Sequence, residues 1–256
     1  MLGPRHRHVR DADVFLASYP KSGNTWLRHL LTFIVTGEPT PWRGGLDKVS
    51  RLIGRHRDLP AIAKHGGRLI KTHEPYRDTY RRAVVMVRDA RDVAVSEYHY
   101  QQAYSDHFHI YGGSFEVFLR RFLAGRCNGY RSWHDHVLSW HAAAEEKRCD
   151  ALTVRFEDFK ADTLGQLRKI VDHIGIAAED QRLQNAIDDC SVESMKQKEK
   201  RFWESKGEPN RNFVRGGKTG GWQQRFTPEL ESQFWSVAGK AMTTMGYERI
   251  HVDEAT

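Results

Sequence analysis

The sequence of 256 residues contains little cysteine, and its cysteines are not arranged for cross-linking or for binding metal. They are widely spaced and odd in number: Cys127, Cys149 and Cys190. Such spacing predicts neither a disulfide framework nor a zinc site. Two close pairs of histidines also lack a carboxylate or cysteine partner at a ligand spacing: His107/His109 and His134/His136. We therefore expect that the protein requires no metal.

The sequence also lacks any apolar run long enough to form a membrane-spanning helix. Its N-terminal segment, Met1 to Asp13, is polar and rich in histidine and arginine rather than signal-like. Lysine and arginine (40) exceed aspartate and glutamate (33), which gives a formal net charge of +7. No basic run with interleaved aromatics marks a nucleic-acid groove, so this charge favours a small polyanionic ligand. We expect a cytoplasmic protein without a membrane span or a nucleic-acid partner.

What the sequence does contain is a strand, a polar loop and a helix in direct succession near the N-terminus. Residues 14–19 form a short apolar run typical of a buried strand, and apolar residues at helical spacing continue from Trp26 to Gly37. The backbone N–H groups of such a loop and first helical turn favour anions. Lys21 adds a charge, and Gly23 lets the backbone approach a ligand closely.

This loop predicts a phosphate or sulfate site, although its polar residues could also serve only to cap the helix. It is not a Walker A loop, because Lys21 precedes the only glycine and no Gly-Lys-[Ser/Thr] ending follows.

Three further apolar stretches predict strands, and helical patterns separate or follow them. The strands are expected at 68–71, 83–87 and 152–156, and the helices at 90–104, 115–123, 132–146, 164–174 and 228–245. This alternation predicts an α/β, P-loop-like three-layer fold with a central, mostly parallel sheet flanked by helices. Residues 37–67 and 193–221 are expected to be long loops. The whole chain, 1–256, is expected to form a single domain with a flexible N-terminus at 1–12.

Polar residues follow two of these strands, at the edge of the sheet where ligands bind. After the strand at 68–71, His73 could act as a general base and Lys71 could stabilise negative charge. The alternative is a surface histidine at a strand end. After the strand at 83–87, Arg88 is suited to bidentate phosphate binding, and Ser96 lies two turns into the next helix. Here the alternative is an arginine that only pairs with Asp92.

A basic, glycine-rich loop lies at residues 213–222. It has four glycines together with Arg215 and Lys218, so its backbone N–H groups could surround a phosphate. It could equally be a flexible loop without a ligand.

Taken together, these segments resemble the soluble, cytosolic type of sulfotransferase that uses 3′-phosphoadenosine 5′-phosphosulfate (PAPS). The loop Pro20 to Trp26 matches the family's 5′-phosphosulfate loop, and Lys71-Thr72-His73 matches the segment with the catalytic histidine. Arg88, Arg91, Asp92 and Ser96 match the motif that binds the 3′-phosphate. Phe156-Glu157-Asp158 and the loop from Arg215 to Trp222 match two later motifs in part.

The resemblance implies that PAPS is the donor co-substrate and that no metal is required. It implies a catalytic role for His73, Lys21 and Lys71. The donor-binding residues that it implies are Lys21, Ser22, Gly23, Asn24, Thr25, Trp26, Arg88, Ser96, Phe156, Ser191, Phe213, Val214, Arg215, Gly216 and Gly217. Segment 193–221 then becomes a mobile loop over the donor site.

Several positions depart from the family pattern. Phe156 replaces a tyrosine, Gly216 replaces a lysine, and Val192 stands where the family has an aromatic partner for the adenine. The C-terminal dimer motif is not kept, since Gln223, Pro228 and Ser232 occupy its positions. The family's mode of dimerisation is therefore not carried over to this chain.

The acceptor is expected to be a small or medium organic molecule with a hydroxyl group. Segments 37–67, 97–113 and 193–212 should shape its pocket, and an aromatic cluster could line it: Tyr98, Tyr100, Tyr104, Phe108 and Tyr111. The same cluster could be ordinary core. Two other functions compete with sulfuryl transfer, namely a magnesium-dependent kinase or nucleotide hydrolase and a non-catalytic nucleotide-binding relative.

Overall fold

The computed structural model describes residues 4–105, 108–208 and 213–249. Its centre is a five-stranded sheet in the order β2-β3-β1-β4-β5, and every neighbouring pair of strands is parallel. The strands are β1 (Val14–Ser18), β2 (Ser50–Leu52), β3 (Leu69–Thr72), β4 (Arg82–Val87) and β5 (Asp150–Arg155). The predicted three-layer α/β fold with a parallel sheet is confirmed.

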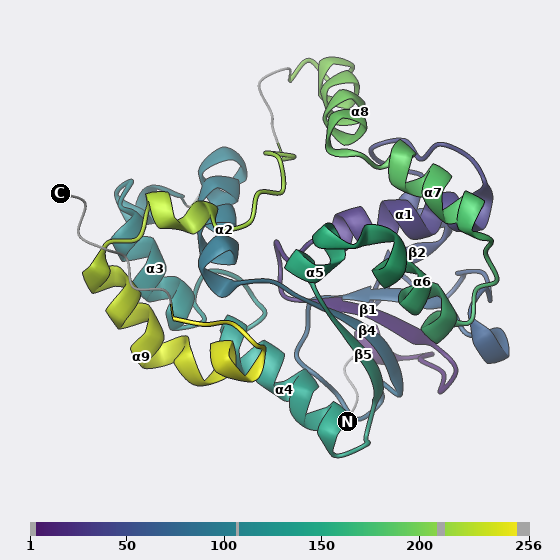
Figure 1. Cartoon of the computed structure of the whole chain (residues 1–256), viewed down its shortest axis with the longest axis horizontal. Helices are drawn as coiled ribbons and strands as arrows, with labels where there is room; N and C mark the ends of the chain where they lie inside the picture. The colour runs from purple at the N-terminus through teal and green to yellow at the C-terminus, as the bar shows by residue number, and fades with distance from the viewer. Residues whose placement is uncertain (1–3, 106–107, 209–212, 250–256) are drawn as a thin grey trace.

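Helices cover both faces of this sheet (Figure 1). Alternate residues of β1 point to opposite faces, so Val14 and Leu16 join one apolar cluster and Phe15 and Ala17 the other. The first cluster packs under α1 (Asn24–Thr36), α5 (Phe156–Ala161), α6 (Thr163–Ile174) and α7 (Asp180–Asp189). The second packs under α2 (Ala90–Tyr104), α3 (Phe115–Leu123), α4 (Trp133–Glu145) and α9 (Pro228–Thr244). Both clusters share one sheet, which agrees with a single domain, although that assignment stays a prediction.

Two segments differ from the sequence prediction. Residues 37–67 contain the edge strand β2 and two short 3₁₀ helices, η2 (Leu46–Lys48) and η3 (Lys64–Gly66). The expected loop at 193–221 is wrong for its first part, because α8 (Val192–Glu204) begins at a Ser191 cap and buries Met195 and Trp203. Another short 3₁₀ helix, η5 (Gly221–Gln224), begins at the end of this segment.

The N-terminal residues that the structure describes pack against the sheet rather than extending freely. They include the short turn η1 (Pro4–His6). The buried His6 ring contacts the Glu74 carboxylate at 2.9 Å and the Tyr80 hydroxyl at 2.9 Å. Arg5 also pairs with Glu74 at 3.0 Å. Arg5 and His6 thus have fixed partners in the structure, and the expected flexibility of residues 1–12 stays a prediction.

Candidate functional site

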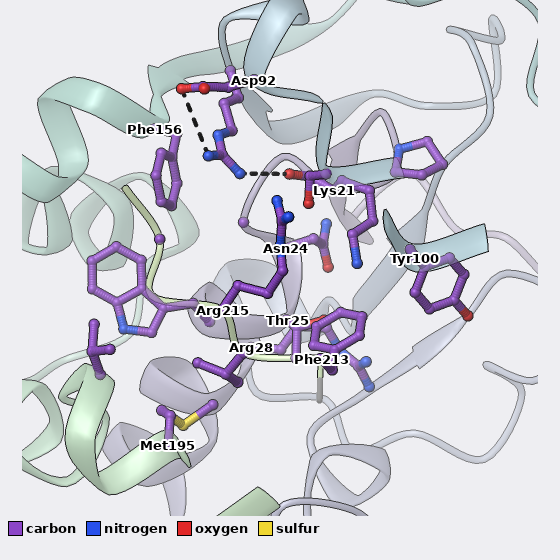
Figure 2. Close-up of a pocket in the computed structure, with 18 of the residues that line it drawn as sticks. Lys21, Asn24, Thr25, Arg28, Asp92, Tyr100, Phe156, Met195, Phe213 and Arg215 are labelled. Carbon is purple, nitrogen blue, oxygen red and sulfur yellow. Dashed lines mark hydrogen bonds and ion pairs between the residues drawn. The ribbon is translucent and has the colours of Figure 1, made fainter. Parts of the chain in front are cut away.

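A cavity of about 1330 Å³ opens at the carboxyl ends of β1, β3, β4 and β5. Because these strands are parallel, the residues that follow them meet at one edge of the sheet. Lys21, His73, Arg88 and Phe156 come from four different connections and all line this cavity. The convergence that the sequence predicted is therefore present, as Figure 2 shows for its labelled residues.

The loop before α1 has a tight backbone that depends on one glycine. Gly23 caps the helix with a φ of 95°, and Lys21 also has a positive φ of 68°. A Cβ on Gly23 would lie 2.7 Å from the Phe156 ring, so a larger residue would displace that ring. The left-handed backbone at Lys21 costs free energy for a non-glycine residue, which is typical of functional loops.

The ammonium group of Lys21 lies between two aromatic rings at the cavity wall. It is 3.7 Å from the centre of the Phe213 ring and 4.3 Å from that of Tyr100. Among the described residues it makes no hydrogen bond or ion pair. Burial, followed by the weaker effects of Arg215 and Arg88, lowers the pKa of Lys21 to about 8. An anion that entered the cavity would restore the charged form.

Arg88 holds two loops together at the other end of this site. Its guanidinium donates to the carbonyl oxygens of Lys21 at 3.3 Å and Lys218 at 2.9 Å, and it lies 4.6 Å from the Phe156 ring centre. Asp92, one turn later on α2, lies 3.7 Å from Arg88 and accepts the backbone N–H groups of Gly220 and Trp222. Arg88 therefore lines the cavity and also pairs with Asp92, and its binding of a phosphate stays a prediction.

Several cations and hydroxyls remain available to a ligand in this part of the cavity. Arg215 makes no hydrogen bond or ion pair among the described residues, and burial together with Arg88 and Arg225 lowers its pKa. Thr25 and Ser96 line the wall, whereas the buried Ser22 hydroxyl, which has no partner among the described residues, does not reach the cavity lining. Lys21 and Arg215 have no ion-pair partner among the described residues, and with Arg88 beside them this group of positive charges is suited to a polyanion.

An aromatic slot adjoins these cations, lined by Trp26 and Phe156, whose rings are inclined at 68°. Trp26 donates from its indole to the Cys190 carbonyl at 3.0 Å, and its ring lies 6.0 Å from Phe156 and 4.7 Å from Phe159. Ser191 and Val192 line the cavity beside it. Asn24 uses its amide to donate to the Leu16 carbonyl at 2.9 Å, so it fixes the loop to β1.

Helix α8 fixes the loop that begins at Phe213. The buried Glu199 carboxylate accepts the backbone N–H groups of Phe213 at 2.5 Å and Val214 at 2.7 Å. Lys160 donates to the Gly217 carbonyl at 2.6 Å. Phe213, Val214, Arg215 and Gly217 line the cavity as expected, whereas Gly216 and Ser22 do not.

His73 presents a free nitrogen to the cavity. Its Nδ1 lies 2.7 Å from the Ser18 carbonyl, an acceptor, so Nδ1 carries the proton and Nε2 holds the lone pair. Burial and the neighbouring Lys71 lower the pKa of His73 well below 6.5, so the ring is neutral at neutral pH. This is the protonation state that a general base requires.

Two cations lie on the other side of His73. Burial and the adjacent Arg28 lower the pKa of Lys71 to about 8. Arg28, one turn into α1, donates to the Ser50 hydroxyl at 2.8 Å and pairs with Asp47 at 3.3 Å. The sequence analysis did not single out Arg28, because a charge inside an apolar helix pattern usually marks the exposed face.

The predicted aromatic wall is correct in part. Tyr100 and Tyr104 line the cavity. Tyr98 and Tyr111 do not, because they lie in the core against Phe118, and the Tyr98 hydroxyl bonds to the Gly113 carbonyl. The side chain of Phe108 lies outside the described residues.

Two further side chains that the sequence analysis missed complete this wall. Asn128 donates to the Tyr19 hydroxyl at 3.0 Å, and the Tyr130 ring lies 5.4 Å from that of His73. Both lie in an irregular connection between α3 and α4 with no pattern to single them out.

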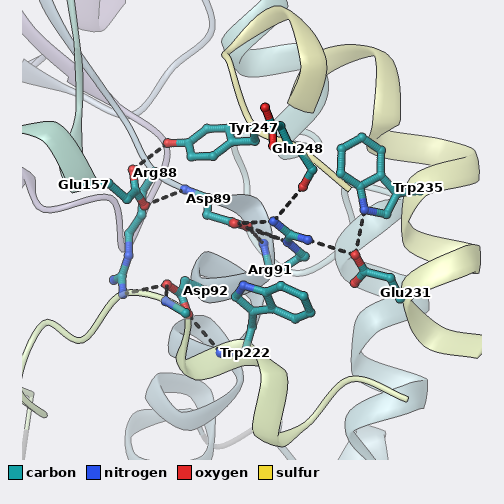
Figure 3. A network of polar contacts seen from close by, with 11 residues as sticks. Arg88, Asp89, Arg91, Asp92, Glu157, Trp222, Glu231, Trp235, Tyr247 and Glu248 are labelled. Atoms are coloured by element: carbon teal, nitrogen blue, oxygen red, sulfur yellow. Dashed lines mark hydrogen bonds and ion pairs between the residues drawn. The ribbon is translucent and has the colours of Figure 1, made fainter. Parts of the chain in front are cut away.

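A second layer of polar contacts connects this site to the last helix (Figure 3). The buried Arg91 donates to Asp89 at 2.7 Å and to Glu231 of α9 at 2.8 Å, and its guanidinium lies 3.9 Å from the Trp222 ring centre. Glu157 accepts the Asp89 backbone N–H and the Tyr247 hydroxyl. The loop at 220–222 is thus anchored to both α2 and α9.

Within the described ranges, no three His, Cys, Asp or Glu side chains group as metal ligands would. His136 is buried in the core beside Tyr19, and burial lowers its pKa to about 3. His107 lies outside the described residues. Nor does any helix within those ranges combine the length and apolarity that crossing a membrane requires.

Comparison with known proteins gives consistent results. A family model described as a sulfotransferase domain matches residues 11–246. Sulfotransferase 2A6 of Rattus norvegicus is 28% identical over 250 residues, covering 91% of this chain and 86% of the relative. Cytosolic sulfotransferase 3 of Arabidopsis thaliana is 28% identical, covering 88% of this chain and 74% of the relative. The crystal structure of mouse sulfotransferase SULT7A1 complexed with PAP superimposes with a TM-score of 0.68 at 27% identity, covering 91% of this chain and 85% of that one.

Proposed function

Because the chain belongs to the sulfotransferase domain family, we propose that it transfers the sulfuryl group of PAPS to a hydroxyl of a small organic acceptor. The observation that carries this proposal is one cavity in which a neutral His73 and uncompensated cations face the same space. The cations suit the phosphosulfate of the donor, and the histidine suits the hydroxyl of the acceptor.

The donor would occupy the side of the cavity lined by α1 and the 213–217 loop. Its 5′-phosphosulfate suits the N–H groups of the loop at 21–25, with Lys21 beside them. Its 3′-phosphate suits Arg88, Ser96 and Arg215. The adenine suits the slot at Trp26, where Phe156 supplies a second ring in place of the family tyrosine. These assignments are supported by the positions of free donors in the cavity.

The reaction would proceed as an in-line displacement at sulfur. Nε2 of His73 takes the proton of the acceptor hydroxyl, and the oxygen forms a bond to sulfur. The bond from sulfur to the 5′-phosphate oxygen breaks, and 3′-phosphoadenosine 5′-phosphate (PAP) leaves with the electron pair. Lys21 stabilises the developing charge on the leaving oxygen, and Lys71 stabilises the sulfonate oxygens.

We also propose that the enzyme is cytoplasmic and that it acts without nucleic acid or a membrane anchor. Because the family dimer motif is not kept at Gln223, Pro228 and Ser232, the proposal does not include the mode of dimerisation that this motif mediates.

A radiolabelled PAPS assay against a panel of phenols and alcohols tests this function. We expect transfer that depends on PAPS, survives excess EDTA and is lost in His73→Ala. The chelator also separates the proposal from the kinase alternative, which requires magnesium-dependent turnover of ATP. Product formation by His73→Ala at the wild-type rate would show that the proposed base is wrong.

A further inference from the structure

A buried carboxyl group that the reaction above does not use lies in the wall of the cavity. Glu97 follows Ser96 on α2, is only 4% exposed, and lines the same cavity as His73 and Lys21. Burying a carboxylate costs free energy unless a cation or hydrogen-bond donors compensate it. The position therefore calls for a compensating group.

The protein itself supplies only part of that compensation. Gln101, one turn later on α2, donates to Oε1 of Glu97 at 2.9 Å and is held in turn by the Cys127 carbonyl at 2.7 Å. Among the described residues no hydrogen bond reaches Oε2. Burial raises the pKa of Glu97, and Lys21 is the one cation that acts against this effect.

Lys21 is nevertheless not an ion-pair partner of Glu97. In the part of the chain that the structure describes, no ion pair within 4.0 Å joins the two, and the Lys21 ammonium lies over the Phe213 and Tyr100 rings instead. In the proposed reaction Lys21 faces the phosphosulfate. Once the donor is bound, its anionic oxygens neutralise Lys21, and Glu97 loses the cation that opposes its charge.

The remaining cations of the cavity lie elsewhere. Arg28 donates to Ser50 and pairs with Asp47, and Arg88 lies 3.7 Å from Asp92. Besides burial, the charge of Glu97 contributes to raising the pKa of the Tyr19 hydroxyl, and Asn128 donates a hydrogen bond to that hydroxyl at 3.0 Å. From Asn128 the wall continues to Tyr130 and His73. Glu97 and His73 thus line the same cavity, and no hydrogen bond joins them among the described residues.

From this arrangement we propose that Glu97 determines acceptor specificity by binding a protonated amine of an acceptor whose hydroxyl lies at Nε2 of His73. The proposal rests on the proposed function and adds the substrate class, an aromatic or aliphatic amino alcohol. The ammonium group of the acceptor donates a hydrogen bond to Oε2 of Glu97. It thereby replaces the positive charge of Lys21, which bound PAPS neutralises. The rings of Tyr100, Tyr104 and Tyr130 suit a phenyl body between the two groups.

Three phenols that differ at one end test the proposal: tyramine with an ammonium group, tyrosol with a hydroxyl, and 4-ethylphenol with neither. We expect the wild-type kcat/KM to be highest for tyramine. Glu97→Gln keeps an acceptor for Gln101 but carries no charge, so the ratio of kcat/KM for tyramine over 4-ethylphenol should fall about ten- to one hundredfold. Glu116→Gln, the control, removes an exposed carboxylate on α3 that does not line the cavity, so that ratio should persist.

An unchanged ratio in Glu97→Gln would overturn the proposal, and so would equal use of tyrosol and tyramine by the wild type. Calorimetric titration of tyramine into the enzyme–PAP complex separates this inference from the proposed function. Binding that weakens in Glu97→Gln, without PAPS-dependent transfer to any phenol, would refute the reaction and support the amine site. Equal tyramine binding by wild type and Glu97→Gln would refute the amine site whatever the turnover.

Discussion

Raising the pH should inactivate this enzyme about two units earlier than ordinary lysines would allow. Lys21 and Lys71 both have a pKa of about 8, since burial disfavours their charged forms. If both must be protonated, each is about one-tenth charged at pH 9. The kcat/KM for PAPS, which reports the free enzyme, should then fall about one hundredfold between pH 7 and pH 9. Unperturbed lysines with a pKa near 10.4 would leave it almost constant.

The slope of log kcat/KM against pH shows how many lysines must be protonated, and a variant shows which ones. Log kcat/KM should fall with a slope approaching −2 above pH 8, and Lys71→Met should reduce the slope to about −1 on a lower plateau. Lys240→Met, which removes an exposed lysine on α9, serves as the control and should leave the slope unchanged. A profile that stays flat to pH 10, with circular dichroism showing an intact fold, would refute the reasoning.

The acid side of the same profile and three variants give the remaining predictions. His73 must be neutral to accept a proton, and its pKa lies well below 6.5, so activity should be retained at pH 6.5 and decline only at lower pH. Arg88→Ala should raise the Kd for PAP about ten- to one hundredfold by calorimetry; an equal loss of acceptor affinity would contradict its assignment to the donor. Glu199→Ala should speed hydrogen exchange at Phe213 and Val214 and weaken PAP, whereas unchanged exchange would show that other contacts hold the loop. Arg91→Met leaves two buried carboxylates unpaired and should cost about 3–5 kcal/mol in urea unfolding, and a loss below about 1 kcal/mol would show that the pair is dispensable.

The parts of the fold that the sequence could predict are those with a strong local pattern. The strand Arg82–Val87 is buried on both faces and reads as a continuous apolar run, and α2 and α3 begin and end where their periodic residues do. The edge strand β2 has only three residues and pairs on one side, so its pattern is too short to distinguish from a loop. Helix α8 is rich in charge, and its burial depends on Met195 and Trp203 meeting distant residues.

The candidate site likewise contains residues that the sequence could predict and residues that it could not. Lys21, His73 and Arg88 directly follow predicted strands, so parallel topology alone brings them together. Glu97 and Arg28 lie inside helices, where a charge usually marks the exposed face. Glu97 does interrupt the buried stripe of α2 between Val93, Tyr98 and Gln101, and a charge at such a position was the available signal. The role of Glu199 depends on a distant loop and had no local signal.

Through the contacts of Arg91, the cavity depends on a helix that lies near the end of the chain. The loop at 21–25 is synthesised early, whereas the segment at 220–222, which donates to Asp92, is anchored through Arg91 to Glu231 of α9 near the end of the chain. A nascent or clipped chain without α9 would contain the loop at 21–25 but would lack the contact between Arg91 and Glu231. The position of the segment at 220–222 beside the cavity therefore depends on the docking of α9.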